Sequence, residues 1–90
     1  MKAVENMNFK ILTKNELKTL HLMAKGYDIK EIATILNVSY TTIKSHLMNI
    51  YRKMYSYFPD GNMSNGNKVK LILMYLKYIG VLKEWEIEGI

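Results

Sequence analysis

The sequence has no cysteine, so it can form neither a disulfide nor a thiolate metal site. Its two histidines, His21 and His46, are far apart in the chain, and neither has a partner at a spacing typical of zinc ligands. It also lacks a paired-carboxylate arrangement, a glycine-rich phosphate loop and a nucleophile–base pair. We therefore expect no metal, no cofactor and no enzymatic activity.

Long apolar stretches are missing as well. No run reaches the roughly 18 consecutive apolar residues that a membrane-spanning helix needs. The opening segment MKAVENMN contains an acid and lacks the apolar core of a signal peptide. We expect a cytoplasmic protein with no membrane segment.

Positive charge, in contrast, is abundant. The 90 residues include 13 Lys and Arg against 8 Asp and Glu, which gives a formal net charge of +5 at pH 7. Lysine supplies nearly all of it, since Arg52 is the single arginine. A small basic domain is a candidate for binding nucleic acid, although basic charge alone is weak support. The length allows one domain, which we divide into an N-terminal arm (1–10), a folded domain (11–80) and a C-terminal tail (81–90).

The segment NVSYTTIKSHLMNIYRKM, residues 37–54, predicts the helix around which the chain is organised. Ser39 is suited to cap its N-terminus, because the hydroxyl can accept hydrogen bonds from backbone N–H groups two or three residues further on. Apolar residues then recur at spacings of three and four, which indicates one buried stripe of a helix over about 40–54. That stripe consists of Ile43, Leu47, Ile50, Tyr51 and Met54, and the acid-free opposite face consists of Thr41, Lys44, Ser45, Met48, Asn49 and Arg52.

A hydrogen-bonding helix face without acids is suited to the major groove of DNA, and the plainer alternative is a surface helix with solvated lysines. The preceding residues favour DNA. Two capping boxes, Thr13–Glu16 and Asp28–Glu31, begin helices that we place at about 14–25 and 29–36. Two short helices, a tight turn and a third helix with a polar outer face make a helix-turn-helix.

The rest of the chain predicts one more helix. The run Phe58-Pro59-Asp60-Gly61 ends the preceding helix, and a polar loop continues to residue 66. A helix then begins near Asn67 and ends before Gly80, and it is apolar on more than one side, which is typical of a helix that packs on the core and also meets a partner. The tail alternates around Trp85 and Ile87 and is open to interpretation as a strand, a helical turn or a flexible end.

Residues 12–54 resemble the LuxR/GerE-type helix-turn-helix of bacterial transcription regulators. That family's pattern runs Leu-Thr-x-x-Glu, then Gly, then Glu-Ile-Ala-x-x-Leu-x-Val-Ser-x-x-Thr-Val-Lys-x-His, then Ile-x-x-Lys-Leu. The chain matches it at Leu12, Thr13, Glu16, Gly26, Glu31, Ile32, Ala33, Leu36, Val38, Ser39, Thr42, Ile43, Lys44, His46, Ile50, Lys53 and Met54.

The resemblance implies an all-α fold of four helices, unrelated to the winged helix, with a C-terminal dimerisation helix. It implies a stand-alone, GerE-like regulator that binds double-stranded DNA as a homodimer with the third helix in the major groove. We assign Thr41, Thr42, Lys44, Ser45 and Met48 to positions near bases, His46, Asn49, Arg52 and Lys53 to phosphates, and Leu71, Ile72, Tyr75, Leu76 and Ile79 to dimerisation.

Two other hypotheses remain open. A domain similar to region 4 of sigma factors shares the Glu-Ile-Ala and Ser-x-x-Thr-x-Lys patterns and would bind promoter DNA while contacting RNA polymerase. His46 and the run Ile50-Tyr51-Arg52-Lys53 favour the first family. In the second alternative the chain is a protein-interaction module, in which the last helix and the tail bind another protein or regulator and the helix-turn-helix is a scaffold.

Overall fold

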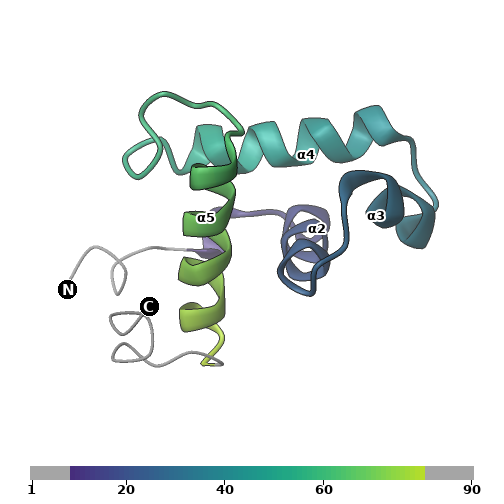
Figure 1. Cartoon of the computed structure of the whole chain (residues 1–90), viewed down its shortest axis with the longest axis horizontal. Coiled ribbons are helices and arrows are strands. Elements are labelled where there is room, and N and C mark those ends of the chain that lie inside the picture. The colour runs from purple at the N-terminus through teal and green to yellow at the C-terminus, as the bar shows by residue number, and fades with distance from the viewer. Residues whose placement is uncertain (1–8, 81–90) are drawn as a thin grey trace.

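The computed structural model describes residues 9–80 (Figure 1). Within this range the chain is all-helical and forms no strand, which confirms the predicted fold class. None of these helices is long and apolar enough to cross a membrane. The elements are the short 3₁₀ helix η1 (Phe9–Ile11) and the α-helices α2 (Lys14–Ala24), α3 (Ile29–Leu36), α4 (Tyr40–Lys53) and α5 (Asn65–Tyr78).

Both predicted capping boxes are formed and fix where α2 and α3 begin. The Thr13 Oγ1 atom accepts a hydrogen bond from the Glu16 N–H at 3.1 Å, and the Glu16 carboxylate accepts one from the Thr13 N–H at 2.9 Å. Asp28 and Glu31 make the same pair of bonds at 2.8 and 2.9 Å. Each box satisfies two N–H groups that the first turn of a helix leaves without a partner.

A left-handed residue makes the turn between α3 and α4. Asn37 has φ 57° and ψ 47°, a conformation that asparagine tolerates better than most residues. Ser39 then caps α4, because its hydroxyl accepts a hydrogen bond from the Thr42 N–H at 3.0 Å. The turn sends α4 back over the other helices, and in Figure 1 it lies across the top of the view above α2 and α3.

The helices meet around α2, which contacts α3, α4 and α5. Every α-helix contributes a fully buried apolar side chain, and burying one of this size stabilises the fold by about 1.5–3 kcal/mol. The contacts of α2 and α3 with α4 fix which side of α4 faces solvent. The fully buried apolar side chains of the four helices are Leu20, Ile32, Ile43, Ile50 and Leu71.

The helix ends differ slightly from the predicted ones. The last helix begins at Asn65, before the predicted Asn67, because the Ser64 hydroxyl caps it by accepting a hydrogen bond from the Asn67 N–H at 3.2 Å. Helix α2 ends at Ala24, followed by Gly26 in a left-handed conformation with φ 102°. At the other end of the domain, the predicted arm of residues 1–10 overlaps the core, since the Phe9 side chain is buried. The rest of that arm and the predicted tail, residues 81–90, lie outside the described residues.

Candidate nucleic-acid interface

The polar side of α4 faces solvent. Thr41, Lys44 and Ser45 are exposed, and Met48 is 47% exposed. The sequence places no acid between Val38 and Tyr57, so this face presents hydrogen-bonding groups and positive charge without a carboxylate. That combination suits an anionic surface with hydrogen-bonding groups, such as the edges and backbone of a nucleic acid.

Lys44 lies about one turn from the N-terminus of α4. Its ammonium nitrogen is 5.9 Å from the centre of the Tyr40 ring, which is within range of a weak cation–π contact. Among residues 9–80 the structure shows no carboxylate paired with Lys44. The charge is therefore available to a ligand that approaches this end of the helix.

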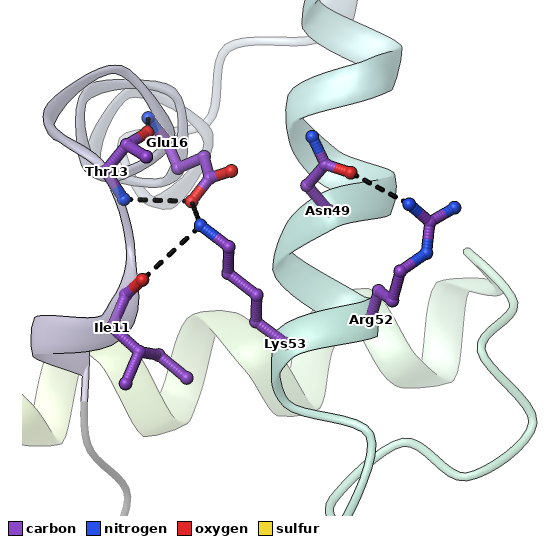
Figure 2. A network of polar contacts seen from close by, with 6 residues as sticks. All are labelled: Ile11, Thr13, Glu16, Asn49, Arg52 and Lys53. Carbon is purple, nitrogen blue, oxygen red and sulfur yellow. Dashed lines mark hydrogen bonds and ion pairs between the residues drawn. The ribbon is translucent and has the colours of Figure 1, made fainter.

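Asn49 and Arg52, one turn further along α4, form a pair. The Arg52 guanidinium donates a hydrogen bond to the Asn49 side-chain oxygen at 3.1 Å (Figure 2). An arginine has five N–H donors, so most of them remain for another acceptor. A guanidinium steadied by a neighbouring amide is suited to binding a phosphate.

Lys53, which we assigned to a phosphate, has a different contact in the structure. Its ammonium group lies 2.8 Å from a Glu16 carboxylate oxygen and donates to the Ile11 carbonyl at 3.4 Å (Figure 2). Glu16 is only 3% exposed. The ion pair therefore connects the start of α2 to the end of α4.

The pKa of Glu16 is lower than that of an ordinary glutamate. Burial alone would raise this pKa, but the hydrogen bonds from Lys53 and Thr13 and the nearby charges of Lys53 and His46 outweigh it. His46 is half-buried, and its contribution to this pKa is the smallest of these. Sequence reasoning missed the contact between Glu16 and Lys53, because a pair separated by 37 positions leaves no periodic signal.

Thr42 is half-buried and also takes part in a local contact. Its hydroxyl forms a hydrogen bond with the Ser39 hydroxyl at 2.8 Å, in addition to the cap that Ser39 makes with the Thr42 backbone. The two hydroxyls together hold the first turn of α4. Thr42 therefore supports the exposed face, whereas Thr41 beside it is the more exposed of the two threonines.

Two of the residues that we assigned to dimerisation belong to the core of the single chain, so they offer no surface to a partner. Leu71 and Tyr75 are buried, and the Tyr75 hydroxyl lies 2.9 Å from the His21 Nδ1 atom on α2. The sequence of α5 is apolar on several sides, so periodicity did not show which side packs inward. The apolar side chains of α5 and its end that are exposed are Val69, Tyr78 and Ile79, with Ile72 and Leu76 half-buried.

A short helix, a tight turn and a capped helix with an exposed, acid-free face define a helix-turn-helix DNA-binding protein. Comparison with known proteins agrees. The pattern of the bacterial regulatory proteins of the luxR family (GerE) matches residues 10–56, just over half of the chain. The chain belongs to this family, and the resemblance inferred from its sequence is confirmed.

Curated relatives match the same region. The nitrate/nitrite response regulator protein NarP of Escherichia coli (strain K12) is 43% identical over 54 residues, which cover 60% of this chain and 25% of NarP. The oxygen regulatory protein NreC of Staphylococcus aureus (strain JH9) is 52% identical over 46 residues, which cover 51% of this chain and 21% of NreC. The chain thus spans a quarter or less of the length of these relatives, and no solved structure matches it significantly.

Membership of the family implies DNA binding in transcription regulation, and the family is not one of enzymes.

Proposed function

We propose that the chain binds double-stranded DNA as a homodimer and regulates transcription, with α4 in the major groove. The observation that carries this proposal is the exposed face of α4, which holds Lys44, Ser45 and Met48 in solvent with no acid among them. The wide major groove of B-DNA admits a helix and presents a distinct set of donors and acceptors for each base pair.

Within that pose, Lys44 and Met48 are placed to read bases. Lys44 can donate to the O6 and N7 atoms of guanine, a contact that discriminates between bases by about 1–3 kcal/mol. Met48 can pack against a thymine methyl group, while Thr41 and Ser45 can donate to either bases or phosphates. Thr42 contributes indirectly, because its hydroxyl contact with Ser39 holds the first turn of α4 in place.

The remaining contacts of α4 go to phosphates. Arg52, steadied by Asn49, is the strongest candidate because a guanidinium can bind a phosphate through two parallel hydrogen bonds. His46 is half-buried and can reach a phosphate only from the edge of the face. Lys53 can contribute its charge at long range, but its ammonium group is already bonded to Glu16.

Dimerisation is proposed through the outer side of α5. Val69 and Ile79 are exposed, and Ile72 and Leu76 are half-buried. At 3.6 residues per turn these four positions fall on one side of the helix, and pairing with a second copy would remove their apolar surface from water. A two-fold dimer of a helix-turn-helix protein places its two recognition helices about 34 Å apart, so that they reach successive major grooves.

A salt titration of DNA binding tests the proposal. The logarithm of the binding constant should fall linearly with the logarithm of salt concentration, with a slope of about −0.9 for each phosphate neutralised. Arg52→Ala should weaken binding to all sequences and reduce the slope by about 1, whereas Lys44→Ala should also relax sequence preference. Lys18→Ala removes an exposed lysine of α2 and serves as the control. Binding that is independent of salt, or equal losses in all three variants, would contradict it.

Light scattering separates the dimer from the alternatives. A dimer at micromolar concentration that dissociates in Val69→Asp supports the proposed use of α5. A monomer would favour the interaction module, in which the same exposed residues bind another protein. Co-purification of RNA polymerase with the chain would favour the domain similar to sigma region 4.

A further inference from the structure

An apolar groove of about 430 Å³ runs between α2 and α3. Four apolar side chains line it, and one of them, Ile35, is 49% exposed although isoleucine is usually buried. Its lining comes only from α2 and α3, so the groove is separate from the exposed face of α4. The apolar lining residues are Leu17, Leu22, Ile35 and Leu36.

Positive charge borders the groove. Lys14, Lys18 and His21 line it from α2, where spacings of three and four place them on one side of the helix. No acidic residue belongs to its lining. Long lysine side chains can pack their methylene groups along an apolar surface while the ammonium groups stay in water. A suitable ligand for this groove is therefore an apolar segment that carries negative charge.

The C-terminal tail, residues 81–90, has that chemistry. Its sequence VLKEWEIEGI alternates Glu84, Glu86 and Glu88 with Trp85 and Ile87. Its apolar side chains match the apolar side of the groove, and its carboxylates match the bordering lysines. In water an exposed tryptophan gains stability by finding an apolar contact.

Helix α5, which precedes the tail, packs beside the groove. Its Tyr75 hydroxyl lies 2.9 Å from the His21 Nδ1 atom, and the helix ends three residues later at Tyr78. Trp85 and Ile87 lie five and seven residues beyond Gly80, so an extended tail carries them about 17 and 24 Å from it, the latter comparable with the two shorter dimensions of the described fold, 24 and 23 Å. A short tether also raises the effective concentration of the tail to about the millimolar range, so that a weak contact suffices.

We propose that the tail of each chain docks into its own groove between α2 and α3, with Trp85 and Ile87 against the apolar lining and the glutamates beside Lys14 and Lys18. The docked tail covers Ile35. This contact is intramolecular and does not depend on DNA or on dimerisation.

Fluorescence tests the contact directly, because Trp85 is the single tryptophan and reports on the tail alone. In the full chain its emission should lie at shorter wavelength, and be less quenched by acrylamide, than that of a free peptide of residues 81–90. These values should not change on dilution. Ile35→Asp and Lys18→Glu should move both values toward those of the peptide. An emission equal to that of the peptide in the unaltered chain would overturn the proposal.

Lys30→Glu is the matched control, because it makes the same charge change on α3 without altering a residue that lines the groove. At 3.6 residues per turn, position 30 lies about 140° around the helix from position 35. Lys30→Glu should therefore leave the emission of Trp85 unchanged. If Lys30→Glu shifted the emission as much as Lys18→Glu, the emission would depend on net charge alone. That result would overturn the proposed contact.

Disulfide formation provides a second measurement of the same contact. It does not depend on the variants Ile35→Asp and Lys18→Glu. Because the chain has no cysteine, the pair I35C with I87C can form only one disulfide within a single chain. That disulfide should form within one chain and several-fold faster than in the pair K30C with I87C. Equal rates in the two pairs, or a disulfide that links two chains, would overturn docking of the tail into its own groove.

Discussion

Removing either partner of the ion pair between Glu16 and Lys53 should loosen the attachment of α4 to α2. Glu16 is 3% exposed and accepts hydrogen bonds from the Lys53 ammonium group at 2.8 Å and from the Thr13 N–H at 2.9 Å. Hydrogen bonds to charged groups contribute about 1.5–3 kcal/mol each. Lys53 remains 35% exposed, so solvent screens the pair and the lower end of that range applies.

Glu16→Gln keeps an oxygen for the capping box but removes the charge, and we expect it to lower the free energy of unfolding by about 1.5 kcal/mol. For a domain of this size such a loss lowers the melting temperature by about 6–12 °C. Lys53→Met should cost about 2 kcal/mol, because it leaves a buried acceptor, the Glu16 carboxylate, without its partner. The double variant should lose less than the sum, with a coupling energy of about 1 kcal/mol.

Urea unfolding followed by circular dichroism, at a series of pH values from 7 downward, measures these losses. The folded state lowers the pKa of Glu16, so the stability that this carboxylate adds is complete above its unfolded pKa of about 4.3. It is lost as the pH falls through the lower pKa of the folded state. The difference between the unaltered chain and Glu16→Gln should therefore shrink below about pH 4.3. Strict additivity at pH 7, or a difference that grows on acidification, would refute the reasoning.

Changes at four further positions test the packing, the turn and the cap. Leu71→Ala should lower the free energy of unfolding by about 2–5 kcal/mol because it opens a cavity in the core, whereas Val69→Ala should change it by less than about 0.5 kcal/mol and weaken self-association in light scattering. Asn37→Ala should lower the melting temperature, at a cost of about 1 kcal/mol, because alanine is strained in the left-handed conformation, while Asn37→Gly should not. Ser39→Ala should remove about 1 kcal/mol of stability, measured by thermal unfolding, through loss of the cap on α4.

The local parts of the fold could be predicted from the sequence, because neighbouring residues determine them. The boxes at Thr13 and Asp28 and the cap at Ser39 each involve contacts three residues apart, and all three are present. The buried stripe of α4 follows from helical spacing, and Ile43 and Ile50 are fully buried as that spacing predicts. The exposed, acid-free face of α4 is the other side of the same pattern.

Contacts between distant positions could not be predicted in the same way. The bond between His21 and Tyr75 joins residues 54 positions apart, and nothing in either local sequence indicates it. Periodicity also failed on α5, since apolar residues occur on several of its sides and only packing against α2 decides that Leu71 faces inward. The inward side of α4 could be predicted from periodicity, because the two sides of that helix differ in polarity.

Selection of bound sequences from random DNA duplexes, performed with the unaltered chain and with Lys44→Ala, tests the central claim most directly. If α4 of each protomer enters the major groove, the unaltered chain should enrich an inverted pair of half-sites about 10–10.5 base pairs apart, centre to centre. Lys44→Ala should retain that spacing and lose the preference at one base pair in each half-site. No enriched sequence, or an identical preference in the variant, would contradict the account.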